Sequence, residues 1–261
     1  MSDNGDGRKP AIAIPGKETF QTPRPRRFYD AAGHAAASGG GFRVLLDGRA
    51  VKTPGKCELV VPTAALAEAI AAEWAAQGET IEPASMPLTR LVNTVIDAVA
   101  READAVAADV VAFAGSDLLC YRAEHPRELV AMQRAAWDPV LDWAETALGI
   151  ALSVVSGVMP IEQPEEAIAR VGEAVGRVSD PYRLASLHVI TTLTGSALLA
   201  LAHLGGRLSA DEVWRAAHVD EDYQIAQWGD DAEAAERRRK RRAEFDAAVQ
   251  LARLAGGANG R

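Results

Sequence analysis

Three consecutive carboxylates, at positions 220–222, lie beside an apolar stripe. Helical spacing places the central carboxylate on the same face as that stripe. The members of the face are Trp214, Ala217, Glu221, Ile225 and Trp228. A carboxylate in an apolar face is either paired inside the fold or kept for a partner, because an unpaired buried charge costs on the order of several kcal/mol. Both explanations stay open for Glu221.

If the face is only partly covered, it predicts a protein-binding surface. An exposed apolar stripe ringed by acids is typical of surfaces that bind other proteins, and aromatic side chains are its usual anchors. The predicted partner-binding residues are Trp214, Asp220, Glu221, Asp222, Tyr223 and Trp228.

The remaining polar residues form no recognisable catalytic pattern. The chain has neither a G-x-S-x-G nor an H-E-x-x-H motif. Cys57 and Cys120 lie far apart, which predicts neither a disulfide framework nor a metal site. We therefore expect no catalytic residues, no metal and no cofactor. The alternative is a small-molecule enzyme with a site between two domains, using Asp97, Asp117 or His188.

The net charge of −8 argues against nucleic acid as a partner, because phosphate binding needs a positive field. The run ERRRKRR (236–242) is the one strongly basic segment that could suggest otherwise. Acids at positions 230, 231, 233 and 236 lie upstream of or within it. This order favours a solvated flank of a helix whose N-terminus attracts acids.

One apolar segment is long enough to cross a bilayer. Residues 184–204 contain no Asp, Glu, Lys or Arg, and a membrane span takes about 20 residues. The segment also contains two histidines, several hydroxyl side chains and Gly195. These features predict a central, buried helix and no membrane span; membrane association is a third hypothesis. The polar N-terminus resembles no targeting signal.

In the first third of the chain, the residue pattern predicts β-strands. Two strand-like runs flank Asp47-Gly48, a dipeptide suited to a tight primed turn, and residues 37–41 predict a hairpin loop. Thr63 is a good N-cap for one helix. We expect a flexible arm over 1–25 and a β-rich domain with one helix over 26–88.

The rest of the chain predicts helices. Residues 89–255 show apolar residues at helical spacing, which predicts a domain of six or seven helices. Pro139 predicts a kink or a break in one of them. The expected fold class is α+β, with a small N-terminal β-rich domain and a larger all-helical domain after it.

Seven motifs occur in an order that resembles a known family. They are RRFY, VLLDGRAVKTP, LVVPTAALAEAIAAEW, SMPLTRLVNTVID, SDLLCYRA, WDPVLDW and EDYQIAQWG. Together they resemble the assembly chaperones of the F-type ATP synthase catalytic head, the family that escorts the alpha subunit. The match covers most of the chain, from about Arg26 to Trp228.

The resemblance implies a chaperone and not an enzyme. Its client would be the free alpha subunit, shielded on its beta-facing surface until the hexamer forms. Within EDYQIAQWG, Glu221 and Asp222 are the closest matches to the acidic positions on which the family depends. The charged segment after Gly229 departs from the mitochondrial members, which also carry a presequence. We therefore expect a monomeric bacterial protein of the cytoplasm, whose eukaryotic relatives work in the mitochondrial matrix.

Overall fold

The computed structural model describes residues 25–157 and 159–256. A small antiparallel sheet comes first. Its strands are β1 (Ala32–Ala36), β2 (Phe42–Leu46), β3 (Arg49–Ala50) and β4 (Val60–Val61). Strand β2 is central, because β1 pairs along one edge and β3 and β4 pair along the other.

The two predicted turns connect these strands. Residues 37–41 link β1 to β2 as a hairpin loop. Asp47 and Gly48 link β2 to β3 with φ angles of 48° and 76°, the positive values that a primed turn requires. Asp47 is held there because its carboxylate accepts hydrogen bonds from the backbone N–H groups of Asp30 and Ala31.

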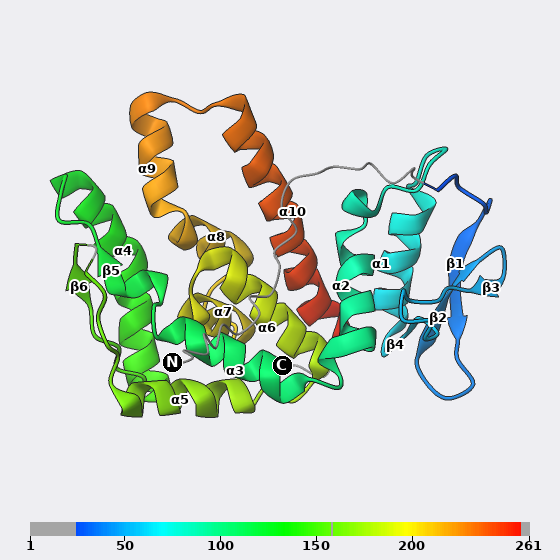
Figure 1. Cartoon of the computed structure of the whole chain (residues 1–261), viewed down its shortest axis with the longest axis horizontal. Coiled ribbons are helices and arrows are strands. Elements are labelled where there is room, and N and C mark those ends of the chain that lie inside the picture. The colour runs from blue at the N-terminus through cyan, green and yellow to red at the C-terminus, as the bar shows by residue number, and fades with distance from the viewer. Residues whose placement is uncertain (1–24, 158, 257–261) are drawn as a thin grey trace, which may run out of the picture.

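Helix α1 (Ala64–Ala75) covers the sheet. It begins after Thr63, whose hydroxyl accepts a hydrogen bond from the N–H of Leu66. Leu66 and Ile70 are fully buried, and the helix packs against β1 and β2. Figure 1 shows the sheet and α1 together at one end of an elongated molecule.

The rest of the described chain is mainly helical. Its α-helices are α2 (Pro87–Thr94), α3 (Ala103–Ala114), α4 (Arg127–Trp143), α5 (Glu165–Gly176), α6 (Pro181–Thr194), α7 (Ala197–Leu204), α8 (Ala210–Ala217), α9 (Val219–Trp228) and α10 (Ala232–Ala255). Short 3₁₀ turns occur at Pro83–Ser85 and Leu118–Cys120, and π-helical turns at Val95–Val99 and Ala144–Leu148. Helix α6 lies in the middle, with α3, α7 and α10 packed around it.

The α+β fold class is confirmed, with three corrections to its details. The helical part also contains a two-stranded parallel sheet of β5 (Tyr121–Arg122) and β6 (Val155–Ser156). Nine α-helices, α2 to α10, lie from Pro87 onward in the described chain, more than the six or seven expected. Of the kink or break expected at Pro139, the break is ruled out, because α4 is helical on both sides of this residue; the kink stays a prediction.

The segment expected to form one buried helix forms two, α6 and α7. The chain leaves α6 at Gly195, whose φ of 70° is left-handed, and Ser196 then caps α7 by accepting a hydrogen bond from the N–H of Leu199. Nearby, the carboxylate of Asp117 accepts a hydrogen bond from the N–H of Leu198. Most of both helices is buried, as expected. None of the helices described here combines the length and the apolar character that a membrane crossing requires.

The strand region and the helices share one continuous core. Helix α10 packs against α2 and α1 as well as α6, and the hydroxyl of Thr63 donates a hydrogen bond to the carbonyl of Leu254. The division at residue 88 stays a prediction.

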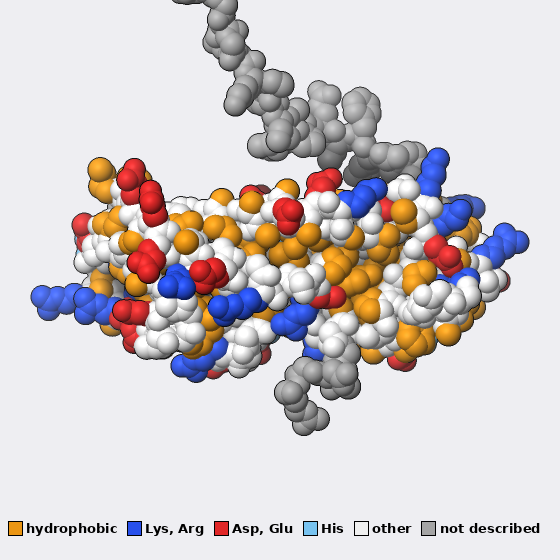
Figure 2. Space-filling model, turned by 90° about the horizontal axis from the view of Figure 1, so that it is seen from below, with side chains coloured by type: hydrophobic (Ala, Val, Ile, Leu, Met, Phe, Trp, Pro, Cys, Tyr) orange, Lys and Arg blue, Asp and Glu red, His pale blue; other side chains and the backbone are white. Residues whose placement is uncertain are grey.

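Seen from below, hydrophobic side chains form a broad central band on the face where α3 and α5 lie (Figure 2).

Candidate functional site

An apolar groove of about 610 Å³ lies between α4 and α8. We call it the α4/α8 groove. Helix α4 contributes Met132, Ala135, Ala136, Pro139 and Val140, the α7–α8 loop contributes Arg207 and Leu208, and α8 and α9 contribute Glu212, Arg215, Ala216, Val219 and Asp222. The side chains from α4 are all apolar, whereas the charged ones lie on the opposite side. A groove of this kind is suited to an apolar side chain of another protein.

The sequence around Ser209 explains why α8 forms. The Ser209 hydroxyl accepts a hydrogen bond from the N–H of Glu212, and the Glu212 carboxylate accepts one from the N–H of Ser209. This capping box satisfies donors that the first helical turn would leave free. Hydrogen bonds from Ser209 also hold the pKa of Glu212 below its usual value. Glu212 is therefore a fixed anion at the edge of the groove.

Two buried hydrogen-bonding side chains of α4 hold the groove together. The indole N–H of Trp137 donates to the carbonyl of Ala216 at 2.7 Å, and Trp137 is only 1% exposed. The side-chain amide of Gln133 donates to the carboxylate of Asp220 at 2.7 Å and accepts from the N–H of Ala123 at 2.8 Å. Helix α4 is thus tied both to the end of α8 and to the start of α9.

The predicted apolar stripe does not lie on one continuous helix. The chain leaves the helical conformation at His218, with φ −119° and ψ 22°, and then restarts as α9. Trp214, on α8, faces inward and is 6% exposed. It stacks on the His218 ring at 3.9 Å and contacts Phe245. The proposed role of Trp214 as an exposed anchor does not fit this position.

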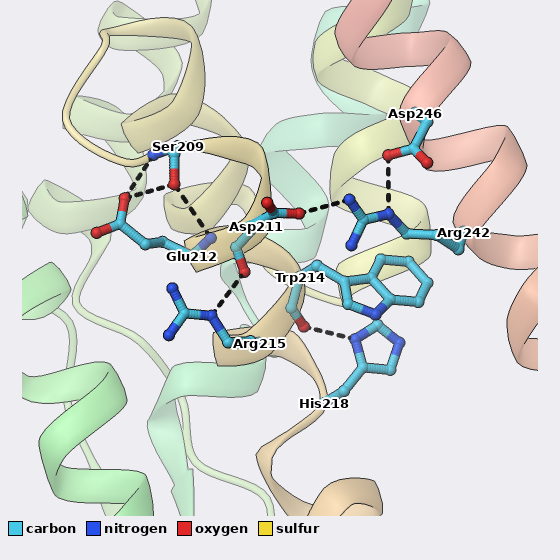
Figure 3. A network of polar contacts seen from close by, with 8 residues as sticks. All are labelled: Ser209, Asp211, Glu212, Trp214, Arg215, His218, Arg242 and Asp246. Carbon is cyan, nitrogen blue, oxygen red and sulfur yellow. Dashed lines mark hydrogen bonds and ion pairs between the residues drawn. The ribbon is translucent and has the colours of Figure 1, made fainter.

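Helix α10 supports α8 through Arg242 (Figure 3). The Arg242 guanidinium donates to Asp211 at 2.6 Å and to Asp246 at 2.8 Å, and it lies 5.4 Å from the centre of the Trp214 ring. The hydrogen bond from Arg242 lowers the pKa of Asp211. The back of α8 is thereby fixed, and its other side faces the groove.

The three consecutive carboxylates have three different environments. Asp220 accepts the hydrogen bond from Gln133, and Asp222 lines the groove and forms an ion pair with Arg238 of α10. The Glu221 side chain is 36% exposed. Its ion-pair contact in the described chain is with Nε2 of His218, 3.8 Å away, which is too far for a hydrogen bond.

The contact between Glu221 and His218 is not a buried ion pair. His218 Nδ1 lies 2.7 Å from the carbonyl of Trp214, which requires Nδ1 to carry the proton. In the neutral ring Nε2 is then an acceptor, and it is buried without a hydrogen bond. Burial lowers the pKa of His218, so the ring is neutral near pH 7. Glu221 therefore keeps hydrogen-bonding capacity for a donor from outside.

The end of α9 is the most exposed part of the predicted surface. Tyr223 is half-buried, and Trp228 is 78% exposed at the last turn. Figure 1 shows α9 at the edge of the molecule, joined to α10 by a short connection. The structure thus places Asp222 in the groove, Glu221 and Tyr223 on the adjoining helix, and Trp228 beyond them.

The basic run is part of the fold of α10. Each of its six cations has a partner in the described chain. Arg237 pairs with Glu233, Arg238 with Asp222, Arg239 and Lys240 with Glu236, Arg241 with the carbonyl of Leu193, and Arg242 with Asp211 and Asp246. These contacts match the helix flank expected from the upstream acids.

The residues considered for an enzyme each make a separate contact. Asp97 accepts from the Thr53 hydroxyl at 2.6 Å, Asp117 is fully buried at the start of α7, and His188 lies 2.7 Å from Asp109. Among the residues described, no three His, Cys, Asp or Glu side chains are grouped as metal ligands.

Sequence reasoning missed the α4 side of the groove. The apolar residues of this segment were read only as helical spacing, whereas Met132 is 37% exposed and Ala135 is also exposed. The available signal was that α4 has apolar residues on more faces than one buried stripe requires.

Comparisons with known proteins agree with this structure. The family model described as ATP12 chaperone protein matches residues 26–145. The crystal structure of Atp12 from Paracoccus denitrificans is 41% identical, with 88% of this chain and 98% of that one covered and a TM-score of 0.79. The Atu1473 protein from Agrobacterium tumefaciens is 47% identical, with 90% and 87% covered and a TM-score of 0.84.

A curated relative, the mitochondrial protein atp12 of Schizosaccharomyces pombe, is 25% identical over 227 residues, which are 82% of this chain and 77% of that protein. Likeness therefore extends across both the strand region and the helices, at identities that establish a common family. The chain belongs to the ATP12 family of ATP synthase assembly chaperones.

Proposed function

We propose that this protein binds the free alpha subunit of the F-type ATP synthase and shields its beta-facing surface until the hexamer assembles. Family membership supports a role in ATP synthase assembly. The observation that carries the finer proposal is the α4/α8 groove with the exposed carboxylate of Glu221 beside it. No chemical reaction is needed for this role, and we propose that the protein catalyses none.

The groove suits a client whose assembly surface is apolar. A subunit that waits for its neighbour exposes such a surface, which otherwise favours aggregation. One client side chain of leucine size buried in the groove would contribute about 1.5–3 kcal/mol. A few contacts of this size hold a client without making the complex permanent, as a chaperone requires.

The carboxylates on α9 would add specificity and reversibility. Asp220 and Asp222 are held by Gln133 and Arg238, which leaves Glu221 as the acid best able to accept a donor from the client. Exposed ion pairs contribute only about 0–1 kcal/mol each, but complementary charges select the correct partner and orient it. The beta subunit could then displace the chaperone by offering a larger interface.

Filling the groove tests this proposal. Ala135 lines the groove on an exposed face of α4, and the neighbouring Arg134 is exposed but does not line it. We expect Ala135→Trp to abolish co-purification with tagged alpha subunit and Arg134→Trp to leave it unchanged, with similar circular-dichroism melts. Added beta subunit should release alpha from the wild-type complex. Equal capture of alpha subunit by the two variants would rule out the groove as its binding site. Alpha subunit that stays bound after beta is added would rule out release by the beta subunit.

A further inference from the structure

A second hollow, of about 600 Å³, lies in the strand region and has no part in the site above. We call it the β3 hollow. Its lining residues are Phe28, Tyr29, Leu46, Asp47, Arg49, Ala50, Val51, Lys52 and Trp74. Phe28 is 71% exposed, although an aromatic side chain of its size is usually largely buried in a folded domain. The hollow therefore offers an aromatic surface to solvent.

Hydrogen bonds and ring contacts hold the aromatic side of the hollow in place. The Tyr29 hydroxyl donates to the carbonyl of Trp74 at 2.7 Å, and the two rings pack edge to face at 5.7 Å. Phe28 packs edge to face on Tyr29 at 5.4 Å. The Arg27 guanidinium holds the adjoining backbone by donating to the carbonyls of Tyr29 and Asp30. A preformed surface binds a ligand with little ordering cost.

The opposite side of the hollow is cationic. Arg49 and Lys52 are exposed, and neither has an ion-pair partner among the residues that the structure describes. The one acid of the lining, Asp47, is directed to the backbone N–H groups of Asp30 and Ala31. Residues 26–62 contain six basic and three acidic side chains, although the whole chain carries a net charge of −8. The hollow is thus locally positive in an acidic protein.

We propose that the β3 hollow is a second protein-binding surface, which takes an apolar side chain flanked by carboxylates from a segment of the partner. The apolar side chain would pack on Phe28 and Trp74, and the carboxylates would face Arg49 and Lys52. The charge of this surface is opposite to that of α9, so it would select a different part of the client. The inference rests on the proposed function only for the identity of the protein that supplies the segment.

Short peptides test the chemistry without the client. The probes are acetyl-Gly-Leu-Phe-Glu-Glu-Gly-amide and its counterpart with two lysines in place of the glutamates. In ¹H–¹⁵N spectra of the full chain, we expect the acidic peptide to shift the amide signals of residues 28–29 and 49–52. The basic peptide should not, and 0.5 M NaCl should weaken the effect. Shifts that are equal for both peptides, or absent from these residues, would overturn the proposal.

Charge reversal supplies the second measurement. The double variant Arg49→Glu, Lys52→Glu should bind the acidic peptide about fivefold or more weakly than the wild type does. The control, Arg101→Glu with Arg177→Glu, makes the same change of net charge at exposed sites outside the hollow and should have no effect. If the client is the alpha subunit, the affinity of the protein for it should fall in the Arg49→Glu, Lys52→Glu variant and not in the control. If the wild type binds the acidic peptide but not the alpha subunit, the proposed function alone is refuted. If the Arg49→Glu, Lys52→Glu variant binds the acidic peptide as tightly as the wild type, the proposed role of the β3 hollow is refuted.

Discussion

The buried carboxyl of Asp117 predicts that the protein loses stability as pH rises. Asp117 is fully buried and caps the chain at two places, accepting from the N–H of Leu119 at 3.1 Å and from that of Leu198 at 3.2 Å. Burial disfavours the charged form more than these hydrogen bonds favour it. The pKa of Asp117 is therefore raised from 3.8 to about 6.

Stability falls with rising pH because the folded state binds the proton on Asp117 more tightly than the unfolded state does. Between pH 4 and pH 6 the folded protein holds a proton on Asp117 that the unfolded chain releases, so the free energy of unfolding falls as pH rises. The contribution is fully present below about pH 4 and is lost once pH passes 6. A difference of about two pH units corresponds to roughly 3 kcal/mol, as an upper limit.

Substitution by asparagine isolates this effect from other titrating groups. Asp117→Asn keeps the shape and one acceptor but does not titrate. We expect urea unfolding, followed by circular dichroism from pH 4 to pH 7.5, to show the wild type losing about 2–3 kcal/mol relative to the variant. A difference between the two proteins that stays constant with pH, or that changes in favour of the wild type, would refute the reasoning.

Two further predictions concern the groove and α9. Trp137→Phe removes the buried donor to the carbonyl of Ala216 and leaves a cavity, so it should lower the free energy of unfolding in urea by about 2–4 kcal/mol. Trp228→Phe, at a residue 78% exposed, should lower it by under about 0.5 kcal/mol. Equal losses in the two variants would contradict the described packing. Glu221→Lys should weaken alpha-subunit capture about tenfold in a pull-down titration with little change in the melting curve, whereas Glu162→Lys, at an exposed position, should change neither. Collapse of the Glu221→Lys melt would show that this carboxylate supports the fold.

Local signals were sufficient for much of the architecture. The turn at Asp47-Gly48 and the cap at Thr63 were both predicted, because each depends on backbone conformations and hydrogen bonds within a few residues. The α+β class followed from the change of periodicity after residue 88. The ordered motifs alone indicated the family.

Contacts between distant segments decided the rest. Contacts with Phe245 and Arg242 of α10 bury Trp214, whereas a continuous 3.6-residue pattern had placed it on the same face as Glu221. The division of residues 184–204 into two helices is, by contrast, local: the left-handed Gly195 ends α6 and the Ser196 cap starts α7, signals that apolar length alone did not reveal.

The sequence by itself determined the α+β class, the turn at Asp47-Gly48, the cap at Thr63 and the family, since these follow from neighbouring residues and from motif order. Only the tertiary structure decided which carboxylate stays available. Asp220 and Asp222 are taken by Gln133 and Arg238, which lie 87 and 16 residues away. The physical reason is that a side chain's availability depends on what packs against it, and linear spacing carries no information about neighbours from another helix.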